Sequence, residues 1–137
     1  MGRKIAVHIR LGDYNAENRL PISYYKDLID QIYQEKPGYE FLIFSDGKDE
    51  ELKEVLELLS TRRVYFGSTM SDILAISSCK ALIGSHSTLT DWGGYLGQLP
   101  VLLPKKPHYG SFLNDLSKEF ILDVERPVIS QDFFRYI

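Results

Sequence analysis

The sequence predicts an α/β domain, a Rossmann-like parallel sheet with helices on both faces. Short apolar runs rich in β-branched residues alternate with longer stretches whose apolar residues recur at helical spacing. The elements follow the order β-α-β-α-β-α-β-α-β, which is typical of a parallel sheet with crossover helices. No linker or internal repeat divides the 137 residues, so we expect a single domain over residues 1–137.

Five strands are predicted from apolar runs that end in polar or turn-forming residues. They cover residues 5–9, 39–44, 63–66, 81–84 and 100–103. Four helices are predicted between them, with Pro21 suited to the start of the first and Ser71 a candidate cap of the third. They cover residues 22–35, 49–59, 71–78 and 89–96. In the tail, residues 120–124 fit a further strand and residues 130–136 a terminal helix.

Composition narrows the classes of function. The net charge is -3 and the basic residues are scattered, so broad affinity for nucleic acid is not expected. The one cysteine, Cys79, lies in an apolar segment and is predicted to be buried and inert. No apolar run approaches the ~18 residues of a membrane span. The expected location is the cytoplasm, with attachment to a membrane surface left open, and the abrupt start at the first strand fits part of a longer protein.

The first strand ends in a cluster of charged residues. His8 and Arg10 close the strand, and Gly12 and Asp13 follow in the loop. Ligands bind at the carboxyl ends of strands in open α/β sheets. Burying the Arg10 guanidinium without a partner would cost several kcal/mol, so it requires an anion, either Asp13 or an external one.

Two further strand-end loops carry polar groups. Ser45 and Asp46 follow the second predicted strand, and the hydroxyl-rich stretch 85–88 follows the fourth and precedes a helix. Hydroxyls and backbone N–H groups at a helix start suit a phosphate. Neither a G-x-G-x-x-G nor a G-x-x-x-x-G-K-[ST] motif is present. The residues alone therefore predict an anion-binding α/β domain.

The sequences of five motifs also resemble those of a known family. In order along the chain stand H-I-R-L-G-D-Y, L-P-I-S-Y-Y, F-L-I-F-S-D, D-I-L-A-I-S-S-C-K-A-L-I-G-S-H-S-T and W-G-G-Y-L-G. This series closely resembles the α-1,2-fucosyltransferases of glycosyltransferase family 11, over residues 5–103. The first motif is similar to the H-x-R-x-G-D signature of the wider fucosyltransferase superfamily.

The resemblance implies the donor-binding half of a two-domain GT-B glycosyltransferase, which binds GDP-fucose without a metal or other cofactor. Arg10 matches the arginine that contacts the β-phosphate and neutralises the departing GDP. His8 matches a residue near the guanine and ribose, and Asp72 the carboxylate that accepts hydrogen bonds from guanine. The remaining matched binding residues are Asp46 at the end of F-L-I-F-S-D, Ser87 and Thr88 at the end of the long motif that follows it, and Thr90 just after that motif. The reaction implied is transfer of L-fucose with inversion to a galactose-type hydroxyl of a glycan.

Several features depart from the family pattern. Leu89 and Asp91 stand where relatives carry aromatic residues, and Gly47 replaces the second acid of S-D-D. The acceptor-side half is absent from this sequence. A general base is not identified, although Asp13 is the nearest candidate and equally suits a role in orienting Arg10.

Structural explanations stand beside these functional ones. Arg10 could pair with Asp13, His8 could be a satisfied core histidine, Asp72 could cap a helix, and Asp46 could form an Asx turn with Gly47. We expect Tyr24, Tyr25 and Trp92 to serve mainly in packing. The rival function is a nucleotide- or phosphosugar-binding module without transferase activity, or a half-enzyme completed by a partner chain or a second copy, so whether the chain alone is an enzyme stays open.

Overall fold

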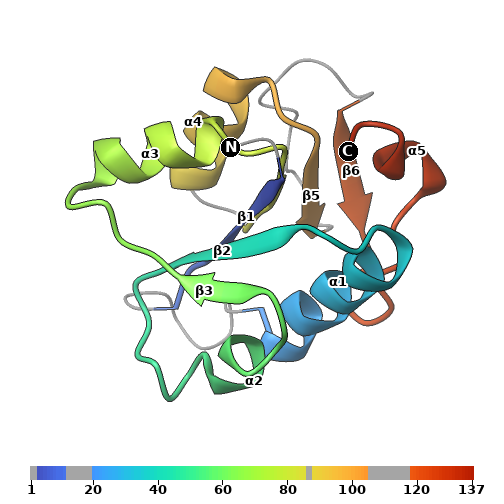
Figure 1. The fold of residues 1–137 in the computed structure, drawn as a ribbon, viewed down its shortest axis with the longest axis horizontal. Helices are drawn as coiled ribbons and strands as arrows, with labels where there is room; N and C mark the ends of the chain where they lie inside the picture. Colours follow the sequence, from blue (N-terminus) through green and yellow to red (C-terminus); the bar gives the residue numbers. More distant parts are fainter. Residues whose placement is uncertain (1–2, 12–19, 86–87, 105–117) are drawn as a thin grey trace.

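A six-stranded sheet forms the centre of the computed structural model, which describes residues 3–11, 20–85, 88–104 and 118–137 (Figure 1). Its strands are β1 (Lys4–Ile9), β2 (Glu40–Ser45), β3 (Thr61–Arg63), β4 (Ala81–Ile83), β5 (Val101–Pro104) and β6 (Glu119–Leu122). The spatial order is β3-β2-β1-β4-β5-β6, and every neighbouring pair is parallel. This is the doubly wound order, so the predicted fold class is confirmed.

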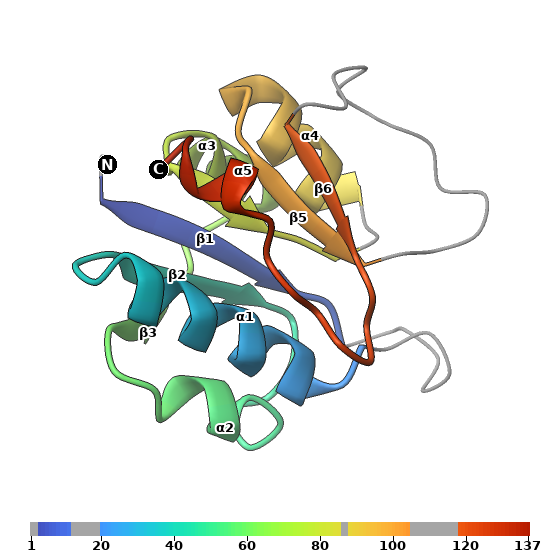
Figure 2. The same cartoon turned by 90° about the vertical axis from the view of Figure 1, so that its right-hand side faces the viewer.

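The helices cover both faces of the sheet. They are α1 (Ile22–Glu35), α2 (Lys53–Leu56), α3 (Thr69–Ser77), α4 (Thr88–Gly97) and α5 (Gln131–Phe134). The helices α1, α2 and α5 lie against one face and α3 and α4 against the other, as Figure 2 shows from the side. Among the described residues, no helix is both long and apolar enough to cross a bilayer.

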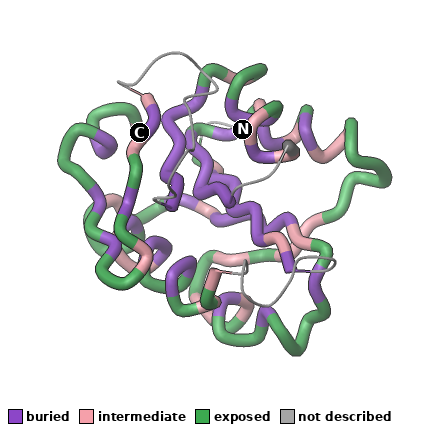
Figure 3. Tube along the Cα trace, turned by 180° about the vertical axis from the view of Figure 1, so that it is seen from behind, coloured by how far each residue is buried: buried purple, intermediate pink, exposed green. Residues whose placement is uncertain are grey.

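The two faces of β1 contribute to separate apolar clusters. Ile5, Val7 and Ile9 point toward α1, and Ala6 points toward α3 and α4. Because both faces are covered, the strand is apolar along almost its whole length, and the sheet is the buried centre of the tube in Figure 3. Apart from Lys4 at its start, the polar residue of the strand is His8, on the side of α3 and α4.

The helix α1 has the bounds that the sequence predicts. Its inner face is fully buried and consists of Tyr24, Tyr25, Leu28, Ile29 and Ile32. These positions recur at the helical period, so this prediction depended only on local pattern. The expectation that both tyrosines belong to the core is confirmed. Cys79 is buried as well, and burial raises the pKa of its thiol to about 11.

Three predicted elements differ in extent from the structure. The helix expected over residues 49–59 is helical only over Lys53–Leu56, because the chain turns at Ser60, where φ is 66°, and the Thr61 hydroxyl donates to the Leu58 carbonyl at 2.8 Å. The strand expected over residues 63–66 starts and ends earlier, at Thr61–Arg63. The third helix starts at Thr69, earlier than expected. Both tail elements are present, as β6 and α5.

Candidate functional site

A cavity of about 480 Å³ opens at the carboxyl end of the sheet. Its walls come from the ends of β1, β2 and β3 and from the first turns of α3 and α4. The lining residues are His8, Arg10, Phe44, Ser45, Asp46, Tyr65, Thr69, Asp72 and Leu89. The sequence placed the strand-end loops of β1 and β2 together, and the parallel pairing of the two strands confirms it.

His8 is the buried polar residue at the floor of this cavity, with an exposed fraction of 6%. Its Nδ1 atom lies 2.8 Å from the Thr90 Oγ1 atom and 3.4 Å from the Ser85 Oγ atom. Burial lowers the pKa of His8 to about 4, against the opposing effect of Asp46 and with a smaller contribution from Arg10 in the same direction. The imidazole is therefore neutral at physiological pH.

Thr90 lies behind the cavity rather than in its wall. Its side chain is 1% exposed, and its Oγ1 atom accepts from the Ser85 backbone N–H at 3.2 Å in addition to contacting His8. A Cβ atom on Gly84 would lie 2.4 Å from the Thr90 Cγ2 atom, so this approach requires glycine at position 84. The expectation that the Thr90 hydroxyl contacts phosphate is not supported, because that hydroxyl is buried against protein partners.

Arg10 follows β1 directly and lines the cavity in a half-buried position. It is the cationic side chain among the described lining residues. Asp13, the alternative partner of Arg10, lies outside the described residues, as do His86 and Ser87.

Asp46 joins the ends of β1 and β2. Its Oδ1 atom accepts from the Leu11 backbone N–H at 2.8 Å, so the carboxylate fixes the chain one residue after Arg10. The proposed Asx turn at Asp46 and Gly47 is wrong, because the Lys48 N–H that would close it donates instead to the Glu51 carboxylate at 2.9 Å. The Gly47 N–H donates to the Ser45 Oγ atom at 3.0 Å. A Cβ atom at position 47 would lie 2.7 Å from the Leu11 Cδ1 atom, which explains locally why glycine fits there.

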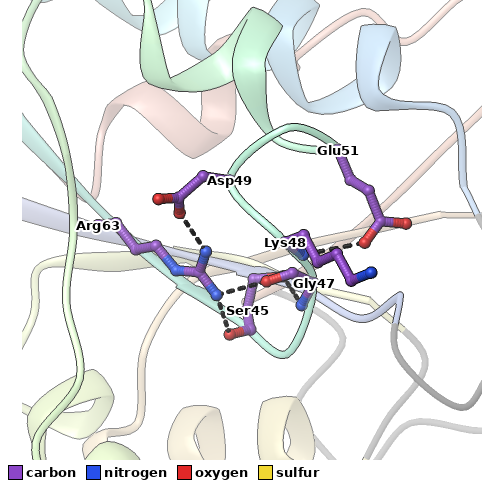
Figure 4. A network of polar contacts seen from close by, with 6 residues as sticks. All are labelled: Ser45, Gly47, Lys48, Asp49, Glu51 and Arg63. Atoms are coloured by element: carbon purple, nitrogen blue, oxygen red, sulfur yellow. Dashed lines mark hydrogen bonds and ion pairs between the residues drawn. The ribbon is translucent and has the colours of Figure 1, made fainter.

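Arg63 at the end of β3 supports this turn from outside the cavity (Figure 4). Its Nη2 atom donates to the Ser45 carbonyl at 3.0 Å and to the Gly47 carbonyl at 2.6 Å, and its Nη1 atom pairs with the Asp49 carboxylate. The guanidinium thus holds three acceptors of the segment that carries Asp46. No feature of the sequence pointed to this role.

Asp72 reaches the cavity from the first turn of α3. Its Oδ1 atom accepts from the Phe66 backbone N–H at 3.0 Å. The proposal that Asp72 or Ser71 caps the helix is wrong, because the Ser68 hydroxyl accepts from the Ser71 N–H at 3.1 Å. Asp72 instead links the segment before α3 to the helix and exposes its carboxylate to the cavity.

The helix α4 points its first turn at the same cavity, through Leu89. It begins at Thr88, of which the backbone alone is described. A helix start carries unpaired N–H groups and a partial positive charge, which attract an anion. Asp91 also lies in this first turn.

Two exposed aromatic residues line cavities. Tyr65, which the sequence placed inside a strand, lies after β3 and lines the cavity with an exposed fraction of 76%. Trp92, which was expected to serve mainly in packing, is 44% exposed, lies edge-on to the Tyr95 ring, and lines a separate apolar cavity of about 310 Å³ between α3 and α4. Because the predicted strand ran to residue 66, no signal in the sequence placed Tyr65 at the cavity.

The cavity thus combines a guanidinium, a neutral imidazole and two carboxylates beside a helix start. The guanidinium and the helix start can bind a phosphate group, and a carboxylate can accept from N–H donors of a base. Within the described part of the chain, no group of three or more His, Cys, Asp or Glu side chains is placed to hold a metal ion.

Several solved glycosyltransferases are similar to this chain in fold. The chain is similar to the heptosyltransferase WaaC from E. coli, solved with ADP-2-deoxy-2-fluoro heptose, at a TM-score of 0.61 and 14% identity over 85% of this chain and 35% of that one. It is similar to the glycosyltransferase SnogD from Streptomyces nogalater at a TM-score of 0.61 and 17% identity, over 89% of this chain and 31% of that one. It is also similar to a family 9 glycosyltransferase from Veillonella parvula at a TM-score of 0.60 and 17% identity, over 88% of this chain and 35% of that one. The chain thus spans about a third of their length.

No curated protein matches the chain. The model of the family described as Glycosyl transferase family 11, however, matches residues 1–106, which is most of the sequence. The doubly wound sheet, a fold that the similar solved glycosyltransferases share, agrees with that match. This chain therefore belongs to glycosyltransferase family 11.

Proposed function

We propose that this chain is the GDP-fucose-binding part of an inverting α-1,2-fucosyltransferase. The observation that carries the proposal is that Arg10 and Asp72 line one cavity at the carboxyl edge of the sheet. One supplies a fork of donors for a diphosphate, and the other a carboxylate for the N–H groups of guanine. Both residues stand, in this order, in the motifs of this sequence that resemble the family.

Arg10 binds the β-phosphate of the donor in this proposal. In the reaction, the acceptor hydroxyl oxygen attacks the anomeric carbon of fucose from the face opposite GDP. The bond from that carbon to the β-phosphate oxygen breaks, and its electron pair leaves with GDP. Charge then builds on the β-phosphate, where the guanidinium and the N–H groups at the start of α4 stabilise it without a metal.

The proton of the acceptor hydroxyl must leave during this step. Asp13 is the proposed base or, alternatively, the residue that orients Arg10. Ser87 and Thr88 are proposed to hold phosphate at the start of α4, and Asp46 to border the donor. His8 is proposed to contact the ribose or base as a neutral group, because its pKa of about 4 keeps the imidazole uncharged.

The acceptor is proposed to bind at a second part that this chain does not supply. The chain spans about a third of the similar solved glycosyltransferases, and its described cavity opens on one side of a single sheet. We therefore propose that transfer to a galactose-type hydroxyl requires an amino-terminal domain, a partner chain or a second copy. A binding module without its own activity is the second candidate.

Calorimetry with GDP and GDP-fucose tests the donor site. We expect binding by the unmodified chain and a loss of at least 10-fold in affinity for Arg10→Ala. Arg135→Ala is the matched control, because Arg135 is exposed just after α5 and pairs with Asp132. Absence of binding at millimolar GDP, or equal affinity in Arg10→Ala, contradicts the proposal.

A transfer assay with lactose-type acceptors then separates enzyme from binding module. We expect little or no transfer of fucose by the chain alone, and transfer once the acceptor-side part is supplied. Rapid turnover by a monomer of this chain contradicts the requirement for a second part, while leaving the donor site intact.

A further inference from the structure

We infer that Tyr65 is the surface on which the nucleobase of the donor stacks, an inference that rests on the proposed nucleotide site. The cavity extends from Arg10, after β1, to Tyr65, after β3, with Asp72 on the wall beside it. A phosphate held by Arg10 and the start of α4 therefore leaves the region near β3 for the base. Tyr65 is the aromatic side chain that combines a place in this wall with high exposure.

The backbone on both sides of Tyr65 is fixed. The Val64 N–H donates to the Ile43 carbonyl at 3.0 Å, which continues the pairing with β2. The Phe66 N–H donates to the Asp72 carboxylate at 3.0 Å. Tyr65 is thus held between two anchored neighbours, although its own side chain is 76% exposed.

The neighbours of Tyr65 pack against the protein. Val64 packs against the apolar cluster under α3 and α4, and the Phe66 ring centroid lies 6.0 Å from that of Phe44. Tyr65 stands between them, lines the cavity together with Phe44, and keeps most of its surface exposed. A large ring on a fixed backbone loses little conformational freedom when a flat ligand covers it.

Tyr65 and Asp72 would then have different tasks. Stacking on an aromatic ring accepts any base, because every base has a π-face. A carboxylate beside the ring favours guanine, which presents adjacent N–H donors, over adenine. Asp72 Oδ1 already accepts from Phe66, so Asp72 both anchors the segment that carries Tyr65 and reads the base.

Titrations with GDP, ADP and inorganic pyrophosphate test this inference. We expect Tyr65→Ala to weaken GDP and ADP binding alike, by about 5-fold to 100-fold, as is typical of lost base stacking. Tyr65→Phe keeps the ring and should bind GDP within about 2-fold of the unmodified chain. Pyrophosphate has no base, so its affinity should not change in either variant.

Two controls define the outcome. Tyr33→Ala removes a partly exposed tyrosine on α1, away from the cavity, and should leave GDP affinity unchanged. Asp72→Asn keeps the acceptor for Phe66 but should reduce the preference for GDP over ADP. Unchanged GDP affinity in Tyr65→Ala, or an equal loss for pyrophosphate, overturns the inference while the donor site stands. Failure of the unmodified chain to bind GDP overturns the proposed function itself.

Discussion

The Nδ1 atom of His8 lies 2.8 Å from the Oγ1 atom of Thr90, and both side chains are buried. This contact joins β1 to the first turn of α4 at the carboxyl edge of the sheet. The same Thr90 oxygen accepts from the Ser85 N–H at the exit of β4. One hydroxyl therefore fixes three of the segments that surround the proposed donor site.

Thr90→Val should destabilise the fold and weaken GDP binding. Valine fills the same volume but leaves the Ser85 N–H unpaired in the interior and removes the 2.8 Å contact to His8. Unsatisfied buried polar groups cost about 1–3 kcal/mol. Urea unfolding measures the first effect and calorimetry the second. Thr90→Ser, which keeps the hydroxyl, should retain GDP affinity, and equal affinities in the two variants would count against a positioning role.

Stability should fall as the pH is lowered from about 6.5 to about 4. The pKa of His8 is about 4 in the folded chain and 6.5 when it is exposed, so the unfolded state binds more protons in this window. The contribution of neutral His8 to the free energy of unfolding is on the order of 3 kcal/mol. It is fully present above pH 6.5 and is lost by about pH 4.

Urea unfolding across this pH range, for the unmodified chain and for His8→Gln, isolates the effect. The two free energies of unfolding should converge as the pH falls, because the variant has no imidazole to protonate. Parallel profiles would mean that His8 is not held neutral by burial. GDP affinity should show no His8 titration above pH 5.5, since the folded imidazole stays neutral there.

Arg63→Ala should loosen the turn that carries Asp46. The guanidinium donates to the Ser45 and Gly47 carbonyls and pairs with Asp49, at a side-chain exposure of 31%. Hydrogen bonds from a charged donor contribute about 1.5–3 kcal/mol when buried, so partial exposure reduces the expected loss to about 1–2 kcal/mol. GDP affinity should fall several-fold as well, because Asp46 moves with the turn.

Arg62→Ala is the control on the same strand. Arg62 makes an exposed ion pair with Glu40, for which a loss of about 0–1 kcal/mol is typical, and it does not line the cavity. Arg63→Lys should not restore the lost stability, because one ammonium does not reproduce the planar fork that reaches the separate acceptors. Full rescue by lysine would show that charge alone matters at this position.

The elements with strong local patterns could be predicted from the sequence. The bounds of α1 follow from an apolar face that recurs at the helical period, and β1 and β2 from continuous apolar runs. The short α2 could not be predicted, because the chain leaves the helix where the Thr61 side chain bonds to the preceding carbonyls. The apolar pattern continues beyond Leu56, so the sequence did not indicate that the helix ends there.

The residues that line the site could be predicted from the sequence, but the residues that hold them in position could not. His8, Arg10, Asp46 and Asp72 line the cavity as expected from their motifs. The sequence could not distinguish Thr90, which is buried against His8, from the hydroxyls expected to contact phosphate, because the two residues are 82 positions apart and their contact depends on the phase of α4.

Tyr24→Phe should raise the stability of the fold. The Tyr24 side chain is 1% exposed, and its hydroxyl has no hydrogen-bond partner among the described residues. Burial raises the pKa of this hydroxyl, with a smaller effect from Tyr25. Because an unpaired buried hydroxyl carries an unrecovered desolvation cost, removing it should add about 1 kcal/mol to the free energy of unfolding.

Tyr33→Phe, on the more exposed side of α1, is the control and should change the free energy of unfolding by less than about 0.5 kcal/mol. A loss of stability in Tyr24→Phe would show that its hydroxyl finds a partner in the folded protein.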